Sequence, residues 1–215
     1  MPIRLQLAID APEHFALVAR LAPFFDLIEV GTPVLKRFGL SAISSALELG
    51  GGKPVLADTK TADGGSLEAE MVFAAGAAMM TVLANASLAT RRDTQAVASR
   101  YCRDVVLDTI LDGDLDGQAL CDGREPQQVW LALHAASDMR RAGVENDNHI
   151  HRVAERRARG FRVCLAGGIR RSNLAHVLQV APDIVVIGSG VTQATDPEGE
   201  AAWIRDQVDA SSPGS

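Results

Sequence analysis

The stretch Pro54-Val55-Leu56-Ala57-Asp58-Thr59-Lys60-Thr61-Ala62-Asp63 decides how this chain is interpreted. Its apolar residues, typical of a buried strand, are followed at once by an ammonium group between two carboxylates. Charges at the end of a buried strand raise the free energy of the fold unless they are paired or bind something. The stretch therefore predicts a strand that ends in a binding or catalytic site.

Apolar runs of the same kind recur on both sides of this stretch. Eight segments qualify as strands: Ile3–Ile9, Asp26–Val30, Pro54–Ala57, Met79–Leu83, Val105–Leu107, Val129–Leu133, Phe161–Leu165 and Ile184–Ile187. They are nearly continuous in apolar residues rather than alternating. This pattern is typical of strands that are covered on both faces by helices or by barrel packing.

Longer amphipathic segments separate these runs and predict helices. They are Pro12–Leu21, Pro33–Leu49, Ser66–Gly76, Ser87–Tyr101, Asn148–Arg159, Ser172–Val180 and Pro197–Val208. Eight strand–helix units in 215 residues predict an α/β fold, a single-domain (β/α)8 TIM barrel over residues 1–210 with a frayed tail at 211–215. A doubly wound open sheet is the competing fold, but no GxGxxG motif follows the first strand.

One unit of this alternation is weak. Between Asp108 and Val129, three glycines argue against a regular helix. The segment Asp112–Gly117 matches the opening of an EF-hand loop, but Gly123 stands where such a loop has its bidentate glutamate. A capped acidic loop over Asp112–Gly123 is therefore preferred to a calcium site.

Composition argues against several classes of protein. The formal net charge is -6, and the one arginine-rich segment, Arg152–Arg159, is interpreted as a solvated helix face rather than a nucleic-acid site. No apolar run approaches the roughly 20 residues of a membrane span. The start Met1-Pro2-Ile3-Arg4 lacks a signal-peptide pattern, so we expect a cytoplasmic protein that binds neither nucleic acid nor membrane. The three cysteines form no CxxC pair and are expected to be reduced, mostly buried thiols.

In a barrel of this kind, the carboxyl ends of the strands meet at one mouth, where function concentrates. Six ionisable residues end the predicted strands: Asp10, Glu29, Asp58, Lys60, Asp108 and His134. Any single one of them could simply bond to a neighbouring loop. As a set, so many converging carboxylates are best explained by a bound cation and a polar substrate.

Two glycine clusters follow the last two predicted strands. Ala166-Gly167-Gly168-Ile169 follows the seventh strand, and Gly188-Ser189-Gly190 follows the eighth. Backbone N–H groups can approach a ligand closely at glycine, and TIM barrels often bind phosphate after these two strands. The clusters therefore predict a phosphate site, with tight turns that merely need glycine as the alternative.

Together these segments resemble the orotidine monophosphate decarboxylase suprafamily, and within it the 3-hexulose-6-phosphate synthases and the 3-keto-L-gulonate-6-phosphate decarboxylases. The matching segments follow the family order over nearly the whole chain: Leu5–Asp10, Glu29–Pro33, Leu56–Asp63, Glu68–Glu70, Thr81–Leu83, His134, Ala166–Ile169 and Gly188. The DxKxxD spacing combined with Glu29-Val30-Gly31-Thr32-Pro33 is the most specific part of the resemblance.

The resemblance implies a role for each matching residue. Glu29 and Asp58 would bind a Mg2+ ion, Lys60 would hydrogen-bond a developing enediolate, and Asp10 would orient the substrate hydroxyls beside it. His134 would shuttle a proton near the reacting carbon. Asp63 would reach the active site of the partner subunit, which implies a homodimer with shared sites. The phosphate would be held by five small residues: Gly167, Gly168, Gly188, Ser189 and Gly190.

The residues themselves favour metal chemistry over an imine mechanism. Lys60 lies between Asp58 and Asp63 in the sequence, so it should stay protonated and act as an electrostatic partner rather than as a nucleophile. A dication with oxygen ligands would stabilise an enediolate as it forms.

Two departures from the family pattern bear on the reaction. Decarboxylase members have an arginine three residues after the histidine, where this chain has Ser137. Many members also have an arginine just after the strand-eight glycine, where this chain has Ser189. Because serine cannot replace a guanidinium, the first departure favours the synthase over the decarboxylase.

We therefore expect Mg2+-dependent aldol addition of formaldehyde, a small aldehyde, to the phosphorylated ketose D-ribulose 5-phosphate, giving D-arabino-hex-3-ulose 6-phosphate. Three alternatives remain open. They are the 3-keto-L-gulonate-6-phosphate decarboxylase reaction, a ribulose-phosphate 3-epimerase-like activity on a phosphorylated ketose, and a non-catalytic barrel that binds a sugar phosphate.

Overall fold

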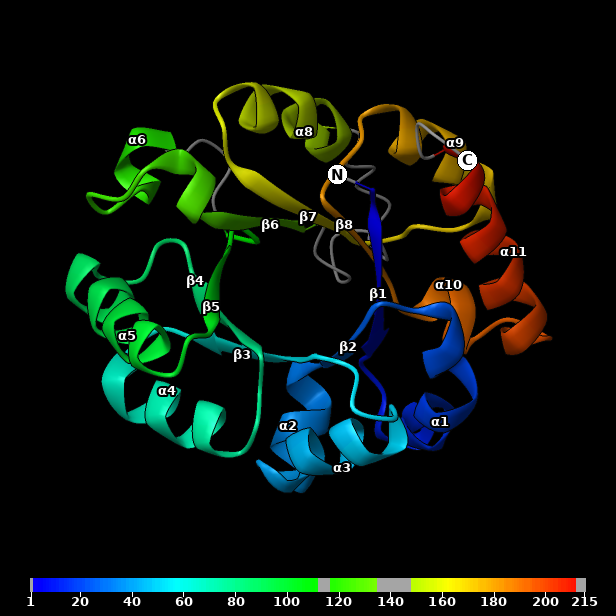
Figure 1. Cartoon of the computed structure of the whole chain (residues 1–215), viewed down its shortest axis with the longest axis horizontal. Coiled ribbons are helices and arrows are strands. Elements are labelled where there is room, and N and C mark those ends of the chain that lie inside the picture. Colours follow the sequence, from blue (N-terminus) through cyan, green and yellow to red (C-terminus); the bar gives the residue numbers. More distant parts are fainter. Residues whose placement is uncertain (1, 112–116, 135–147, 212–215) are drawn as a thin grey trace.

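The computed structural model describes residues 2–111, 117–134 and 148–211, apart from the side chains at 117, 118, 148 and 149. Within these ranges, eight parallel strands close into a barrel in sequence order, with β8 paired to β1. The strands are β1 (Arg4–Ile9), β2 (Leu27–Val30), β3 (Val55–Thr61), β4 (Met79–Leu83), β5 (Asp104–Asp108), β6 (Trp130–His134), β7 (Arg162–Ala166) and β8 (Ile184–Ile187). The predicted single-domain (β/α)8 TIM barrel is confirmed (Figure 1).

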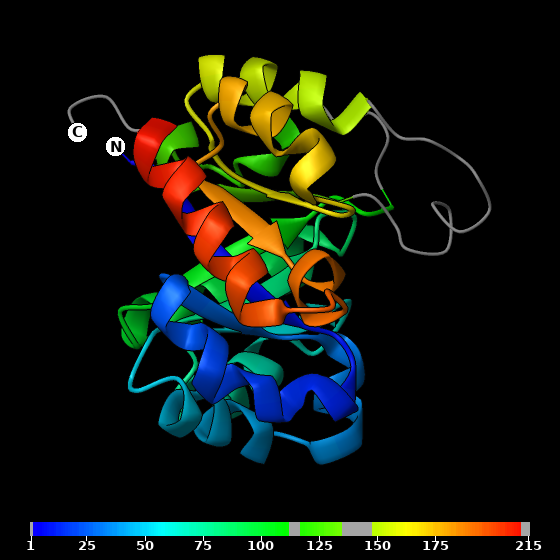
Figure 2. The ribbon, with the colours of Figure 1, turned by 90° about the vertical axis from the view of Figure 1, so that its right-hand side faces the viewer.

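Helices surround the barrel on its outer side (Figure 1, Figure 2). The α-helices are α1 (Val18–Leu21), α2 (Thr32–Phe38), α3 (Ser41–Leu49), α4 (Gly65–Ala74), α5 (Leu88–Arg100), α6 (Gly117–Leu120), α8 (Asn148–Ala158), α9 (Arg171–Gln179), α10 (Ser189–Thr192) and α11 (Pro197–Ser211). Short 3-10 helices are η1 (Pro12–Leu17), η2 (Ala22–Phe24) and η3 (Pro126–Gln128). None of the helices in the described ranges is long and apolar enough to span a bilayer.

The predicted helices differ from the structure mainly at three places. The segment Pro12–Leu21, expected as one helix, is the 3-10 helix η1 followed by the four residues of α1. The single helix expected over Pro33–Leu49 is two helices, because Gly39 after α2 has a φ of 66°, in the left-handed region, where a helix cannot continue. The last helix, α11, continues to Ser211 instead of ending at Val208. Ser211 therefore belongs to the helix, and the rest of the expected tail, residues 212–215, lies outside the described residues.

The weak unit after β5 is partly described. Residues 112–116, where the calcium-loop resemblance begins, lie outside the described residues. The segment that follows forms the short helix α6 and then a turn in which Asp122 and Gly123 both have positive φ values, 53° and 89°. Asp122 Oδ1 lies 2.5 Å from Arg91 Nη2 on α5, so this carboxylate fastens the segment to the neighbouring helix.

Apolar side chains fill the barrel from the inside and also separate it from the helices. The inner cluster includes Leu27, Leu56, Val106 and Ile184, and the outer layer packs the other face of each strand against the helices. Two of the three cysteines, Cys121 and Cys164, are buried, and Cys102 is exposed. Burial raises the pKa of the Cys164 thiol, so it stays protonated inside the barrel.

Trp130 closes the barrel at the amino ends of the strands. It is the first residue of β6 and is 5% exposed. The guanidinium carbons of Arg4 and Arg162, the first residues of β1 and β7, lie 5.3 Å and 5.1 Å from the centroid of its ring. An aromatic ring and two stacked cations therefore pack at this end of the barrel, whereas ligands of TIM barrels bind at the carboxyl ends of the strands.

Candidate active site

The third strand carries the centre of the site. The sequence predicts its end at Ala57, but β3 continues to Thr61. Lys60 has a φ of 48°, unusual for a residue other than glycine, and the pairing of β3 with β4 shifts register between Ala57 and Thr61. The Thr81 Oγ1 atom of β4 accepts a hydrogen bond from Lys60 N at 2.9 Å, which helps to hold this backbone conformation.

The Lys60 ammonium group bridges two strands of the barrel. Its Nζ atom lies 2.8 Å from each carboxylate oxygen of Asp58 and 2.9 Å from Asp108 Oδ2 on β5. Burial alone would lower the pKa of Lys60, but the charges of the two carboxylates outweigh it and raise the pKa above its ordinary value. Lys60 is therefore a fixed cation, as the sequence predicts. Its second carboxylate is Asp108 and not the expected Asp63.

Asp58 is almost completely buried and has a donor at every acceptor position. Oδ1 accepts hydrogen bonds from Lys60 and from Thr81 Oγ1 at 2.8 Å, and Oδ2 accepts them from Lys60 and from Thr32 Oγ1 at 2.8 Å. Thr32 is the first residue of α2, which places a hydroxyl from the β2 connection against β3. The orientation of this carboxylate is therefore fixed by donors from three neighbouring strand–helix units.

Asp108 is a candidate site residue to which the sequence analysis gave no role of its own. Its Oδ1 accepts the Ile110 backbone N–H at 2.9 Å, and its Oδ2 lies 3.8 Å from His134 Nδ1. Burial on its own would raise the pKa of Asp108, but His134 and Lys60 lower it to about 2. Asp108 thus links the fixed cation to the histidine, and its place at the end of a predicted strand was the available signal.

Glu29 lies on the same side of the mouth, at the end of β2. Its carboxylate accepts a hydrogen bond from Gln6 Nε2 of β1. Burial raises the pKa of Glu29 well above its ordinary value, and the nearby charges of Asp58 and Asp10 raise it further. Gln6 is 2% exposed, and its Oε1 atom has no hydrogen-bond partner among the described residues. A buried polar residue within the apolar segment Leu5–Ile9 was the sequence signal for this contact.

Two glycines flank the Asp10 carboxylate. A Cβ atom on Gly31 would overlap Asp10 Oδ1 and would lie 2.7 Å from the Ile9 carbonyl oxygen. A Cβ atom on Gly188 would lie 3.1 Å from Asp10 Oδ2. Because these glycines follow β2 and β8, the strands on either side of β1, they let the carboxylate lie between them. Gly31 is the glycine of the Glu29–Pro33 motif, so the geometry gives that position a physical reason.

The connections after β7 and β8 are shaped by backbone conformation. Gly167 and Gly168 have φ values of 98° and 72°, which residues with a Cβ rarely adopt. The Gly168 carbonyl accepts a hydrogen bond from Asn173 Nδ2 at 3.0 Å. A Cβ atom on Gly190 would overlap the Ile169 carbonyl oxygen, so this glycine lets the two connections touch. Ser189 is exposed. Glycine is therefore required here by the turns, and the phosphate role of these residues stays a prediction.

A cavity of about 30 Å3, open at the mouth of the barrel, brings most of the predicted residues together. Its polar lining consists of Gln6, Glu29, Asp58, Lys60, Thr81, Asp108 and His134. Asp10 is outside this lining, although its charge reaches Glu29. Asp63 is exposed on the connection between β3 and α4, so its predicted role in a second subunit is not tested within one chain.

Residues 3–204 match the model of the Orotidine 5'-phosphate decarboxylase / HUMPS family. The chain belongs to this family. A curated relative, the 3-hexulose-6-phosphate synthase of Mycobacterium gastri, is 31% identical over 206 residues, which cover 94% of this chain and 98% of the relative. Because the family is enzymatic and curated relatives are lyases, this family member is an enzyme of the carbon–carbon lyase type.

Solved structures of the same family superpose on nearly the whole chain. The crystal structure of 3-hexulose-6-phosphate synthase from Salmonella typhimurium has a TM-score of 0.87 and 33% identity, covering 98% of this chain and 100% of that chain. A crystal structure of KGPDC from Streptococcus mutans, solved as a ligand complex, has a TM-score of 0.86 and 25% identity, covering 97% and 98%. The two structures represent a synthase and a decarboxylase, the two reaction types that the sequence analysis compares.

The donor set of this family member fits a magnesium ion in its chemistry. Mg2+ prefers oxygen ligands and is commonly held by one or two carboxylates together with waters and substrate. Glu29 offers a carboxylate whose ionisation is opposed by burial and by its acidic neighbours, and a nearby dication would relieve this. At Asp58, a cation would have to replace one of the present donors. No group of three or more His, Cys, Asp or Glu side chains within the described ranges could hold a metal ion.

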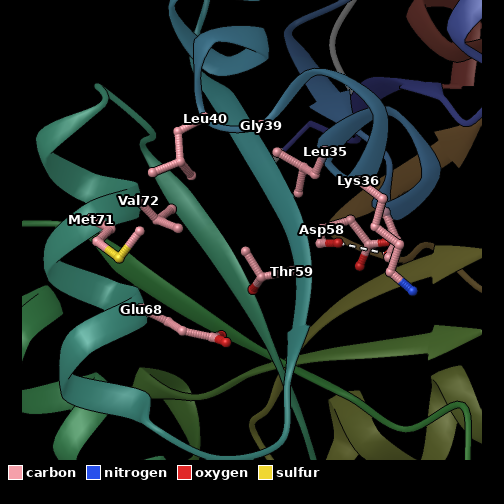
Figure 3. Close-up of a pocket in the computed structure, with 10 residues that line it drawn as sticks. Leu35, Lys36, Gly39, Leu40, Asp58, Thr59, Glu68, Met71 and Val72 are labelled. Atoms are coloured by element: carbon pink, nitrogen blue, oxygen red, sulfur yellow. Dashed lines mark hydrogen bonds between the residues drawn. The ribbon is translucent and has the colours of Figure 1, made fainter.

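A second hollow lies outside the barrel wall, between α2 and α4 (Figure 3). It has a volume of about 250 Å3 and is lined mainly by apolar side chains, including Leu35, Leu40, Met71 and Val72. Glu68 and Thr59 line its polar part, and Glu68 accepts a hydrogen bond from the Thr61 hydroxyl. Asp58 and Thr32 line this hollow too, so it reaches the back of the site.

Proposed function

We propose that this enzyme catalyses the aldol addition of formaldehyde to D-ribulose 5-phosphate with Mg2+, giving D-arabino-hex-3-ulose 6-phosphate. The observation that carries the proposal is the Lys60 ammonium group held between the buried carboxylates of Asp58 and Asp108. A permanently charged donor held in a fixed position by two carboxylates stabilises negative charge on a substrate oxygen. The same charge keeps Lys60 from attacking a carbonyl, which disfavours an imine mechanism.

The reaction needs one proton to leave carbon and one to reach oxygen. His134, whose Nδ1 atom faces Asp108, takes a proton from the carbon beside the ketone and leaves an enediolate. Lys60 donates a hydrogen bond to the enediolate oxygen while the charge develops. The carbanion carbon then bonds to the formaldehyde carbon, and the former aldehyde oxygen takes up a proton. Asp10, fixed between two glycines, orients the sugar hydroxyls.

Glu29 and Asp58 are the residues that would hold Mg2+. The ion would supply positive charge at the ketone and hydroxyl oxygens of the substrate, where the enediolate forms. The raised pKa of Glu29 supports this assignment, because a buried carboxylate beside other carboxylates gains from a cation. Gln6 holds the Glu29 carboxylate from β1 and so limits its orientation.

We propose further that two copies form a homodimer in which Asp63 completes the site of the partner subunit. Two apolar residues of α4 support an interface there: Leu67 is 68% exposed and Met71 is 48% exposed. Complementation tests the arrangement. Mixing inactive Lys60→Ala and Asp63→Asn subunits should restore about a quarter of the activity, because half of the dimers then have one intact site of two. No recovery would count against shared sites.

The decarboxylase reaction remains the second candidate, and the likeness to the KGPDC structure is the observation behind it. The distinguishing residue, Ser137, lies outside the described residues, so the sequence alone argues against this reaction. An epimerase-like activity is less well supported, because His134 is the one histidine that ends a strand in the described ranges, whereas such a site needs two or more. A non-catalytic barrel does not agree with membership of an enzymatic family.

The proposal is tested by incubating the protein with D-ribulose 5-phosphate and formaldehyde and measuring hexulose phosphate, with Mg2+ and with a chelator. We expect turnover that stops with the chelator and in Asp58→Asn. A parallel incubation with 3-keto-L-gulonate 6-phosphate should release no CO2. Equal rates with and without the chelator would refute the metal assignment. Release of CO2 without aldol addition would favour the second candidate.

A further inference from the structure

The connection after β8 contains no positively charged side chain for a phosphate dianion. The segment from Gly188 to Asp196 has no lysine or arginine, and Ser189, the residue that follows Gly188, carries only a hydroxyl group. Backbone N–H groups alone can hold a phosphate, but a cation adds charge-assisted bonds that are roughly twice as strong as neutral ones. In the connection after β7, Arg170 is the cation nearest in sequence to the glycine pair Gly167 and Gly168.

Arg170 is held by its backbone while its side chain stays accessible. It precedes α9, and its backbone N–H donates to Asn173 Oδ1 at 2.9 Å. Its Nε atom lies 3.4 Å from the Gly168 carbonyl oxygen, a long and weak hydrogen bond. The same carbonyl accepts the shorter bond from Asn173. These contacts keep the start of the Arg170 side chain beside Gly168 and leave its terminal nitrogens available.

The neighbouring Arg171 is in a different situation, although the two residues are adjacent and both exposed. Arg171 Nε lies 2.6 Å from Glu200 Oε2 on α11, and its guanidinium carbon lies 4.3 Å from the centroid of the Trp203 ring. Its charge and its flat face are therefore already used by α11. Arg170, by contrast, forms no such ion pair: among the described residues, no carboxylate oxygen lies within 4.0 Å of its side-chain nitrogens.

We propose that Arg170 binds the phosphate group of the substrate and supplies the guanidinium that Ser189 cannot. This inference deepens the proposed function and rests on it, because it requires a phosphorylated substrate at the mouth of the barrel. A guanidinium offers paired N–H donors that match two oxygens of one phosphate. Arg170 approaches the glycine pair from the β7 side, whereas an arginine at position 189 would approach from β8.

The test compares Arg170→Met with the matched control Arg171→Met. Arg170→Met should raise the KM and the Kd for D-ribulose 5-phosphate at least about tenfold, the scale of a lost charge-assisted hydrogen bond, and change kcat less than about threefold. Competitive inhibition by inorganic phosphate should weaken in parallel. Arg170→Lys should recover part of the affinity. Arg171→Met should leave KM and Kd unchanged and lower only thermal stability, since it loses the contacts with α11.

Two kinds of failure are distinguishable. If the unmodified enzyme neither binds nor converts D-ribulose 5-phosphate, the proposed function is wrong, and this inference is overturned with it. If the unmodified enzyme works but Arg170→Met has the same KM and Kd, the proposed function stands and the role of Arg170 is wrong. An equal loss of affinity in Arg170→Met and Arg171→Met would also overturn it, because a general effect on α9 would then explain both.

Discussion

The two sides of the barrel mouth are built in opposite ways. On the acidic side, β3 and β5 provide charged side chains that hold one another by short contacts, with Lys60 at the centre, and Glu29 of β2 lines the same cavity. On the glycine side, β7 and β8 lead into turns that need glycine, because Gly167 and Gly168 have positive φ values and Gly190 has no space for a Cβ atom. Asp10 lies between the two sides, with Gly31 and Gly188 against its carboxylate, and these three residues form the seam.

The difference teaches which kind of change each side tolerates. On the acidic side, removing a group leaves its partners charged and buried, which strongly raises the free energy of the fold. On the glycine side and at the seam, adding an atom is the damaging change, because the backbone conformation or the neighbouring atoms leave no place for a side chain. Substitutions on the two sides are therefore expected to differ both in the size of their effect and in whether they change activity or stability.

The largest effect is expected at Lys60. Lys60→Ala should lower kcat at least ~10²-fold, because the donor that meets the developing enediolate charge is lost. The variant should still bind D-ribulose 5-phosphate, since binding through the phosphate involves the other side of the mouth. Steady-state kinetics and titration calorimetry separate the two quantities.

Lys53 provides the control for this change, because it lies just before the opposite end of the same strand and is remote from the mouth. Lys53→Ala should have ordinary kcat and KM values. If Lys60→Ala retains near-normal kcat, the proposed role of Lys60 is wrong, whatever happens to stability. If it no longer binds substrate, the two sides of the mouth are not independent.

A smaller effect is expected at the seam. Gly31→Ala should destabilise the fold by roughly 1–3 kcal/mol and lower activity, because the new methyl group overlaps Asp10 and the Ile9 carbonyl. Gly188→Ala should be milder, since its nearest contact is 3.1 Å. Gly31 has a φ of -64°, which any residue adopts, so backbone strain does not contribute to the effect at Gly31. Urea unfolding and steady-state kinetics on both variants measure the two effects. Equal effects would mean that contact with Asp10 is not the reason for glycine at these positions.

The barrel itself could be predicted because its signals are local. Continuous apolar runs and amphipathic segments fixed seven of the eight strands to within one residue of each end. The third strand was the exception, since its last residues are polar and Lys60 has a positive φ. Polar residues in a strand and a left-handed lysine are both unfavourable locally, and contacts with β4 and β5 stabilise them. Such tertiary contacts leave no periodic pattern in the sequence.

The sequence predicted which residues line the site better than it predicted which of them contact one another. Strand ends gave Glu29, Asp58, Lys60 and His134, which line one cavity. The pairing of Lys60 with Asp108 was missed, because a residue forty-eight positions away cannot be ranked against Asp63 without knowing how the strands are arranged. Closure of the barrel places β5 two strands from β3, and this geometry decides the pairing.

The smallest effect concerns pH and tests whether Asp108 belongs to the acidic network. Its pKa in the folded chain, about 2, is lower than the ordinary carboxyl value of 3.8, so the unfolded chain binds this proton first as the pH falls. The ionised form therefore contributes its full stabilisation above pH ~4 and loses it as the pH falls towards 2. Between pH 7 and pH ~3, the linked change in unfolding free energy is about 1 kcal/mol.

Asp108→Asn cannot titrate, so its unfolding free energy should change by about 1 kcal/mol less over the same pH interval. Asp104→Asn is the matched control, because Asp104 is an exposed carboxylate at the other end of β5, far from Lys60. Urea unfolding at several pH values gives the three curves. Identical slopes for the unmodified chain and Asp108→Asn would mean that Asp108 is not stabilised as an anion. The acidic side would then hold Lys60 through Asp58 alone, and the contrast between the two sides of the mouth would be weaker than the contacts indicate.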